Sequence, residues 1–359
     1  AEERQLKLQK TEFYAFCHFG MNTFTGKEWG DGKTPPEVFN PTDFDAEQWA
    51  MSVKSAGMKA LILTCKHHDG FCLWPSEYTD YSVKNSPFKD GNGDIVKEVA
   101  EACRKYSLGF GVYLSPWDRH EKTYGSGAAY NTYYKNQLRE LLTNYGDIFC
   151  VWLDGACGEG PNGKVQKYDW NGYYALVREL QPNAVICVSG PDVRWIGHEA
   201  GVCRSSEWSV VPAWLSNTDY IAEKSQKVDD EKFRKKHNEM TLDLGSRKAI
   251  KGETAFIWYP AEVDVSIRPG WFYHENEDAK VKSLKKLYDI YIKSVGGNAA
   301  LLLNIPPDKR GKIAKTDELT LDSFGRLLKR RFPKNLASDA KATSSSEIDN
   351  EHLAKNIIE

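Results

Sequence analysis

Residues 147–155 read DIFCVWLDG, a short apolar run that ends in Asp154 and a glycine. A continuous apolar run of this length is typical of a parallel strand that is buried on both faces. The aspartate follows the last apolar residue, at the point where such a strand would end. The stretch therefore predicts a buried strand that presents one carboxyl group at its carboxyl end.

Similar runs recur along the chain, and amphipathic helical patterns separate most of them. One such pattern places Ile95, Val99, Cys103 and Tyr106 at spacings of three to four residues. Seven runs are clear and an eighth, at 202–208, is weaker. This alternation predicts an α/β fold, a (β/α)8 TIM-like barrel, over residues 1–331. The clear runs occupy residues 14–19, 60–64, 109–114, 147–153, 184–189, 255–259 and 298–305.

The composition argues against several classes of protein. Lys and Arg number 48 against 50 Asp and Glu, a net charge of −2 that argues against a nucleic-acid partner. The mean hydropathy is −0.57, and the longest apolar stretches are far shorter than the ~20 residues of a membrane helix. The 8 cysteines form no CxxC pair, so buried free thiols are expected rather than a zinc site.

The residues that follow the predicted strands are unusually polar and aromatic. In a barrel the carboxyl ends of the strands meet at one face, which carries the active site. Asp154 is the first candidate there, because glycoside hydrolysis requires two carboxyl groups and this one ends a strand. Its partner is open between Glu199, Glu207 and Glu262. Glu199 ranks first because it lies in a glycine-flanked loop.

Three histidines at the same predicted face fit either metal binding or the recognition of hydroxyl groups. Adjacent residues of a strand point in opposite directions, so His67 and His68 reach one metal ion only if the backbone bends. Neutral imidazoles that donate to one hydroxyl and accept from another are the simpler interpretation for this pair and for His18. Aromatic side chains suited to stacking on a sugar or contacting a methyl group are Trp29, Tyr113, Trp152 and Trp271.

These motifs together resemble those of the α-L-fucosidases of glycoside hydrolase family 29, across nearly the whole chain. The resemblance implies that Asp154 is the nucleophile and that Trp271 touches the methyl group of fucose. It also implies a fucose pocket formed by His18, Glu28, Trp29, His67, His68 and Tyr113. The matching motifs are His18-Phe19-Gly20, Glu28-Trp29, Lys66-His67-His68-Asp69-Gly70-Phe71, Tyr113-Leu114-Ser115-Pro116, Trp152-Leu153-Asp154-Gly155 and Leu301-Leu302-Leu303-Asn304-Ile305.

The acid/base position differs between subgroups of this family. Segments 190–195, 199–201 and 207–209 look like the subgroup that acts on branched α-1,3 and α-1,4 fucosides, which implies Glu199 as the acid/base. The subgroup active on simple aryl fucosides places that residue differently, which keeps Glu262 as a rival. The expected reaction is an exo-acting, retaining hydrolysis of terminal L-fucose in Lewis-type glycans, with the two carboxyl groups roughly 5 to 5.5 Å apart.

Further expectations concern the rest of the protein. Residues 332–359 resemble a linker and the start of an incomplete galactose-binding-like β-sandwich. The substrate class implies an exported protein, periplasmic or secreted, although residues 1–10 carry no signal-peptide pattern. No cofactor and no metal are expected, and the partner is a fucosylated oligosaccharide or glycoconjugate. The alternatives are a metal-dependent TIM-barrel hydrolase and a catalytically inactive fucose-binding protein.

Overall fold

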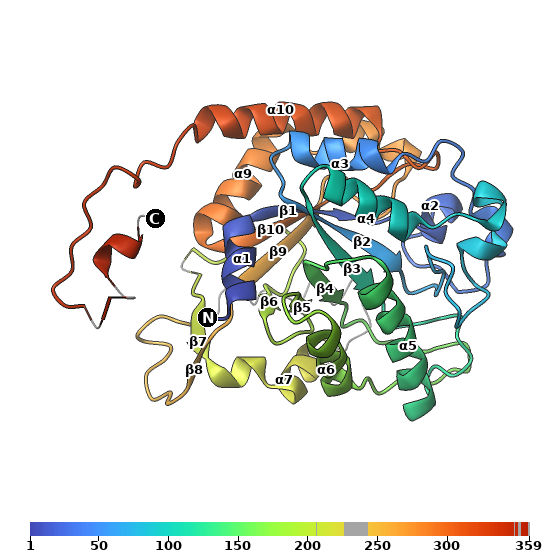
Figure 1. Ribbon diagram of the computed structural model, residues 1–359, viewed down its shortest axis with the longest axis horizontal. Helices are drawn as coiled ribbons and strands as arrows, with labels where there is room; N and C mark the ends of the chain where they lie inside the picture. Colours follow the sequence, from blue (N-terminus) through green and yellow to red (C-terminus); the bar gives the residue numbers. More distant parts are fainter. Residues whose placement is uncertain (206, 226–242, 348, 351–352, 358–359) are drawn as a thin grey trace.

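The computed structural model describes residues 1–205, 207–225, 243–347, 349–350 and 353–357. Eight strands form a closed barrel in the order β1-β10-β9-β6-β5-β4-β3-β2, and neighbouring strands are parallel (Figure 1). The predicted barrel is therefore confirmed. Its strands are β1 (Phe13–Cys17), β2 (Ala60–Lys66), β3 (Gly109–Leu114), β4 (Cys150–Leu153), β5 (Val185–Val188), β6 (Val193–Trp195), β9 (Ala261–Ser266) and β10 (Ala299–Asn304).

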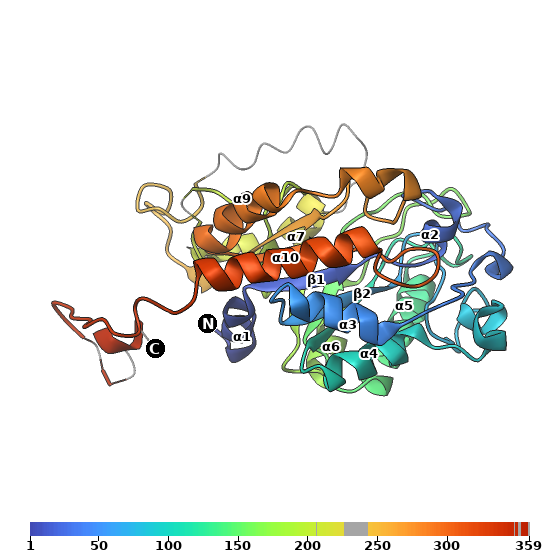
Figure 2. The same cartoon turned by 90° about the horizontal axis from the view of Figure 1, so that it is seen from above.

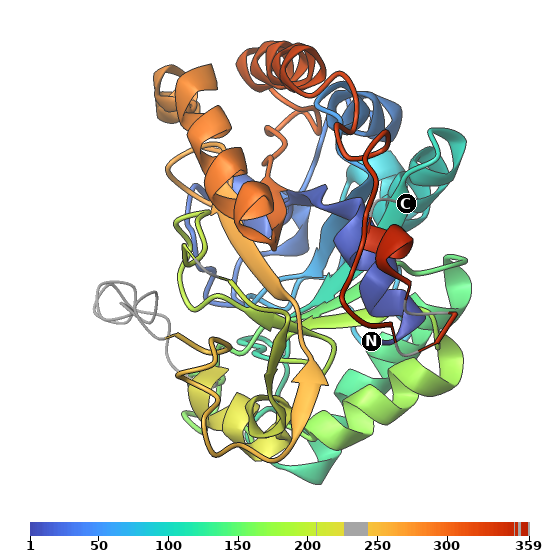
Figure 3. The same cartoon turned by 90° about the vertical axis from the view of Figure 1, so that its left-hand side faces the viewer.

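Helices surround the strands, as Figure 3 shows. The helix predicted from its spacing buries Ile95, Val99 and Cys103 against the barrel, and α10 lies between α9 and α3 (Figure 2). The helices are α1 (Glu3–Thr11), α2 (Met21–Thr25), α3 (Ala46–Ser55), α4 (Ile95–Lys105), α5 (Ala128–Asn144), α6 (Trp170–Leu180), α7 (Thr218–Ser225), α9 (Leu284–Ser294) and α10 (Lys315–Arg331).

Two of the predicted barrel strands are wrong. The run at 255–259 contributes β8 (Phe256–Trp258), which pairs antiparallel with β7 (Val210–Pro212) in a separate two-stranded sheet. The described part of 202–208 contains no strand, and its place in the barrel is taken by the three-residue β6. The seventh barrel strand is β9, and two residues separate it from the end of β8.

The sequence of β9 explains why it was missed. It reads AEVDVS, and all six residues are buried. Ala261, Val263 and Val265 join the apolar core between barrel and helices, while alternate residues carry carboxyl and hydroxyl groups. A continuous apolar run indicates a strand with two apolar faces, whereas one face of β9 is polar.

The amino-terminal helix closes the end of the barrel opposite the strand carboxyl ends. Leu8 of α1 is fully buried in the same apolar cluster as Tyr14, Phe16 and Leu302, which fill the inside of the barrel. The Gln5 side chain fixes the helix by donating to the backbone oxygens of Asp192 and Trp258, both at 2.8 Å. The barrel therefore has a packed floor.

Beyond α10 the chain leaves the barrel (Figure 1). The described residues after 332 include a short 3-10 turn at Ala354–Ile357, and the β-sandwich resemblance of this segment stays a prediction. All eight cysteines are buried free thiols, as predicted. Every helix within the described ranges is too short or too polar to cross a bilayer.

Candidate active site

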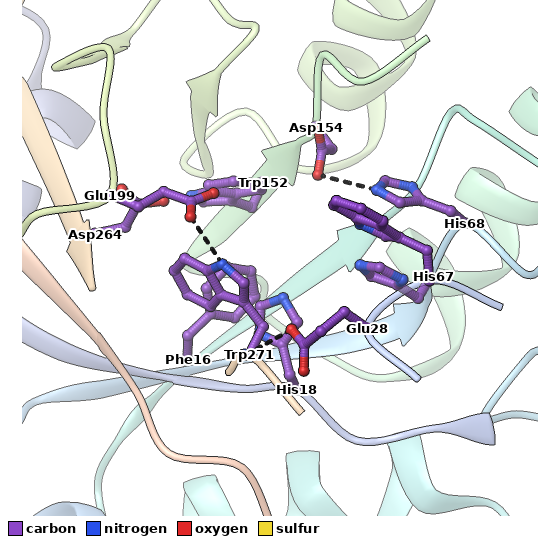
Figure 4. Close-up of a pocket in the computed structure, with 11 residues that line it drawn as sticks. Phe16, His18, Glu28, His67, His68, Trp152, Asp154, Glu199, Asp264 and Trp271 are labelled. Carbon is purple, nitrogen blue, oxygen red and sulfur yellow. Dashed lines mark hydrogen bonds and ion pairs between the residues drawn. The ribbon is translucent and has the colours of Figure 1, made fainter. Parts of the chain in front are cut away.

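A cavity enclosing about 400 Å³, counted to its open mouth, lies at the carboxyl ends of the barrel strands (Figure 4). It collects side chains from segments that are far apart in the sequence, which is what a barrel rim does. The lining residues are Phe16, His18, Glu28, Trp29, His67, His68, Trp152, Asp154, Glu199, Asp264 and Trp271. The structure thus brings together nine of the ten predicted site residues, and Tyr113, the tenth, reaches the cavity through a hydrogen bond to Asp154.

Asp154 follows β4 directly and is held from two sides. The hydroxyl of Tyr113, on the neighbouring strand β3, donates to Asp154 Oδ2 at 2.9 Å. The backbone N–H of Ala156 donates to Oδ1 at 2.8 Å. Both carboxylate oxygens are therefore oriented before any ligand arrives, and the side chain remains 25% exposed at the cavity.

His68 has a tautomer set by its neighbours. The Ser115 hydroxyl donates to the backbone oxygen of Trp117 at 2.6 Å, so it accepts from His68 Nδ1 at 2.7 Å. In the neutral imidazole, Nε2 is then a hydrogen-bond acceptor, and it lies 3.8 Å from Asp154 Oδ2. A hydroxyl group that enters between them can donate to either atom.

The turn that carries His67 and His68 rests on a buried ion pair. Lys66 Nζ, at the end of β2, lies 2.9 Å from Asp118 Oδ2, and both side chains are fully buried. Burial alone would raise the pKa of Asp118, but Lys66 and two backbone N–H groups outweigh it and hold that pKa below its usual value. Gly70 closes the turn with a φ of +88°, where a Cβ would lie 2.5 Å from Asp118 Oδ1.

His18, at the end of β1, is held neutral. Its ring Nδ1 and backbone N–H both donate to Oδ1 of Asn304, at 2.9 and 3.1 Å. Burial lowers the pKa of His18 to about 3, and the hydrogen bond to Asn304 only partly opposes this. The imidazole therefore recognises a ligand by hydrogen bonding rather than by charge.

His67 is also buried, and its pKa is lowered well below the usual value by burial and by the neighbouring imidazoles of His68 and His18. Its ring stacks on Tyr113, with centroids 5.8 Å apart and planes within 16°. Within the described part of the chain, Nδ1 of His67 has no hydrogen-bond partner. A buried polar atom of this kind is costly unless a ligand or water satisfies it.

Glu28 organises the loop after β9. Its carboxylate accepts from the backbone N–H groups of Trp271 (2.8 Å) and Phe272 (3.3 Å), and it lies 2.7 Å from His274 Nε2. Glu28 therefore lines the cavity and at the same time fixes the segment that carries Trp271. His274 was missed in the sequence, where no motif singles it out.

Glu199 and Asp264 form the opposite wall of the cavity from Asp154 (Figure 4). The indole Nε1 of Trp271 donates to Glu199 Oε2 at 3.0 Å, and that of Trp195 donates to Asp264 Oδ1 at 2.9 Å. Burial, and then the negative charge of Glu199, raises the pKa of Asp264 well above its usual range. Asp264 was missed because its strand was not recognised.

The two rival carboxyl groups lie elsewhere. Glu262 is fully buried within β9 and accepts from the Tyr14 hydroxyl and, at 2.8 Å, from Trp152 Nε1. Burial raises the pKa of Glu262 to about 7. Glu207 is buried in ion pairs with Arg194 and Arg204. The sequence placed Glu262 after the seventh strand and Glu207 within the sixth. Both positions are wrong, because Glu262 lies inside β9 and Glu207 lies outside any described strand.

The described residues also bear on metal binding. Within them, no three side chains among His, Cys, Asp and Glu come together in an arrangement that could hold a metal ion. The three rim histidines instead meet Asn304, Ser115 and an aromatic ring. The metal-dependent alternative therefore has no ligand set in this part of the chain.

Comparison with known proteins now bears on this site. The family model described as α-L-fucosidase matches residues 3–331, which is nearly the whole barrel. The chain belongs to the α-L-fucosidase family. The family predicted from the sequence is thus confirmed, and so is its barrel fold.

Relatives within the α-L-fucosidase family extend beyond this chain. Alpha-L-fucosidase 1 of Arabidopsis thaliana is 44% identical over 99% of the chain, which spans 66% of that relative. A Bacteroides ovatus crystal structure, provisionally named an α-L-fucosidase, is 52% identical with a TM-score of 0.85, over 93% of this chain and 56% of that one. A Ruminococcus gnavus GH29 fucosidase, solved in complex with fucose, is 34% identical with a TM-score of 0.77, over 94% and 69%.

Proposed function

We propose that this chain is the catalytic part of a retaining, exo-acting α-L-fucosidase that removes terminal α-1,3- or α-1,4-linked L-fucose from branched glycans. The observation that carries the proposal is the cavity itself. Asp154 directly follows β4 and Glu199 lies in the loop after β6, and the carboxyl groups of both line the same pocket. Family membership and the fucose complex of the Ruminococcus gnavus relative support the sugar.

The pocket suits an uncharged, hydroxyl-rich ligand with one apolar edge. His18 and His67 are neutral because burial lowers the pKa of each. Nδ1 of His18 donates to Asn304, which leaves its Nε2 as an acceptor, whereas the ring of His67 can donate to one hydroxyl and accept from another. The unpartnered Nδ1 of His67 is one such position. Phe16 and Trp271, with ring centroids 6.4 Å apart, provide an apolar surface for the methyl group of a 6-deoxy sugar.

In the first step of the proposed reaction, Asp154 attacks the anomeric carbon while the bond to the leaving oxygen breaks. Glu199 gives its proton to that oxygen, so the aglycone leaves as a neutral alcohol. In the second step a water molecule attacks the anomeric carbon, the bond to Asp154 breaks, and the water's proton passes to Glu199. Tyr113 and the Ala156 N–H hold Asp154 in line throughout.

Azide separates the two roles. In Glu199→Ala, azide should attack the fucosyl-enzyme and give a fucosyl azide of retained configuration, since the nucleophile is intact. In Asp154→Gly, azide should replace the nucleophile and give the inverted product. A fucosyl azide of retained configuration formed by Glu262→Ala or Glu207→Ala, but not by Glu199→Ala, would overturn the acid/base assignment.

Linkage is tested with matched oligosaccharides. The unaltered chain should release fucose from a Lewis-type trisaccharide faster than from a linear α-1,2 fucoside, and proton NMR should show α-fucose as the first product. Faster release from the linear or a simple aryl fucoside would contradict the branched-substrate proposal. No release from any α-L-fucoside would leave the inactive fucose-binding protein as the correct interpretation.

A further inference from the structure

Strand β9 carries two carboxyl groups, Glu262 and Asp264, and Glu199 lines the same cavity as Asp264. Glu262 and Asp264 are alternate residues of the strand, so both point to the inside of the barrel, and Asp264 reaches the cavity. Glu199 lies in the loop that follows β6, the strand paired with β9 through Arg194↔Ala261 and Trp195↔Glu262. The pairing of β6 with β9 therefore brings Glu199 and Asp264 to the same wall, as Figure 4 shows.

Each carboxyl group of this pair accepts a hydrogen bond from an indole N–H. Trp195 Nε1 donates to Asp264 and Trp271 Nε1 donates to Glu199, and an indole N–H carries no charge. In the described part of the chain, Asp264 is 3% exposed and forms no ion pair with Lys, Arg or His. Among the described residues, no cation therefore forms an ion pair with this buried carboxyl group.

We propose that Asp264 is the proton-sharing partner of Glu199, so that the two carboxyl groups hold one proton between them and Glu199 keeps a proton to donate at neutral and mildly alkaline pH. This inference rests on the proposed function, in which Glu199 protonates the leaving oxygen. Asp264 acts through Glu199 and is a positioning residue for its proton. It forms no bond to the substrate and is regenerated unchanged.

The electrostatic surroundings support a shared proton. Two neighbouring carboxyl groups in a desolvated site cannot both ionise cheaply, so the second proton is held to higher pH. Glu262 stands below Asp264 as a further carboxyl group, with Tyr14 and Cys187 beside it, and its own pKa is raised to about 7 by burial. The other titratable residues around the cavity are His18, Glu28, His67, His68 and Asp154.

Of these, the imidazoles of His18 and His67 are neutral, since burial lowers the pKa of each far below the working range. They supply no positive charge that would release the shared proton. During the reaction the proton passes from Glu199 to the glycosidic oxygen as the C–O bond breaks. It is replaced by the proton of the attacking water, so the pair begins and ends each cycle with one proton.

The pH profile of Asp264→Asn tests the proposal. The kcat/KM of the full chain is measured against pH on a Lewis-type trisaccharide, whose leaving group needs an acid, and on a dinitrophenyl fucoside, whose leaving group does not. For the trisaccharide, the basic limb of the profile should move to lower pH by about one unit or more, because two interacting groups shift each other's pKa by at least that amount. The dinitrophenyl substrate should show no such shift.

Glu262→Gln is the matched control, because it removes a buried carboxyl group from the same strand and face. Its basic limb should move less than that of Asp264→Asn, because Glu262 raises the pKa of Asp264 less than Glu199 does. An equal shift in both variants, an unchanged limb in Asp264→Asn, or an equal loss on both substrates without a shift would each overturn the pairing.

A second measurement is independent of turnover. Carbon-13 NMR of labelled aspartate follows Asp264 in the unaltered chain and in Glu199→Gln, where the apparent pKa of Asp264 should fall once its charged neighbour is gone. No fall would refute the pairing even if Asp264→Asn does not fold. Absence of fucose release by the unaltered chain would refute the proposed function instead, and this titration would still decide the pair.

Discussion

At the scale of single residues, Asn304 connects the parts of the site. Its Oδ1 accepts from the backbone and the ring of His18, and its Nδ2 donates to Ser266 Oγ at 2.9 Å and to the backbone oxygen of Trp271 at 2.8 Å. The side chain is fully buried at the end of β10. Because both ends of the amide are used, an acceptor and a donor are required at this position.

Asn304→Asp tests this requirement. The new carboxylate keeps the acceptor for His18 but faces the Trp271 carbonyl without a donor, and a negative charge beside an imidazole favours its protonated form. We expect the pKa of His18 to rise from about 3, measured by nitrogen-15 NMR. KM for an aryl fucoside should rise about tenfold, as for one lost buried hydrogen bond.

The matched control is Asn298→Asp, just before the other end of β10, where the amide nitrogen donates to the Glu207 backbone oxygen. It should leave both His18 and KM unchanged. If the pKa of His18 is the same in Asn304→Asp as in the unaltered chain, the contact between the side chain at 304 and the imidazole is contradicted.

At the scale of elements, β9 combines an apolar outer face with a carboxyl-bearing inner face. Burial raises the pKa of Glu262 from 4.5 to about 7. Between these values the folded chain keeps a proton that the unfolded chain has lost, so the free energy of unfolding falls as the pH rises through this window. The difference between these two pKa values corresponds to roughly 3 kcal/mol of unfolding free energy.

Glu262→Gln should remove this dependence. The melting temperature of the variant minus that of the unaltered chain should be higher at pH 8 than at pH 5, because an amide has no proton to lose. Calorimetry at both pH values measures the difference. Glu101→Gln, an exposed position on α4, provides the control. A Glu262→Gln difference that is the same at both pH values would contradict the buried titration.

Strand β9 also shows which parts of the fold could be predicted from the sequence. The strands with two apolar faces, such as β4, were predicted correctly, and with β4 the position of Asp154 directly after its last residue. Strand β9 could not be recognised because its inner face bears Glu262 and Asp264, and the three residues of β6 are too few to show a pattern. The role of Asn304 depends on contacts with β1 and the loop after β9, which no local pattern reveals.

At the scale of the whole molecule, the barrel ends with α10 and the residue after it. Leu321 and Phe324 of α10 are buried, and the ring of Phe332 packs on Tyr288 and Tyr291. Leu336, by contrast, is 81% exposed. We propose residues 1–331 as the catalytic unit and the following segment as the start of a separate module.

Removal of residues 335–359 should therefore leave the barrel intact. We expect kcat/KM on an aryl fucoside within about twofold and a melting temperature within about 2 °C, as for changes at an exposed surface. Removal of residues 315–359, which also deletes α10, should destabilise the barrel strongly, since the buried side chains of α10 are lost. A large loss of activity in the shorter deletion would contradict the proposed boundary.

The packed floor made by α1 has a consequence for the order of events during turnover. Because Leu8 and Tyr14 fill the barrel on the side opposite the cavity, the cavity is closed at that end. In the proposed reaction the aglycone lies nearer the open mouth and departs before water arrives, and the freed sugar leaves through the same mouth. If the chain acts as proposed, we therefore expect liberated fucose to compete directly with the next substrate, so that the product inhibits the reaction.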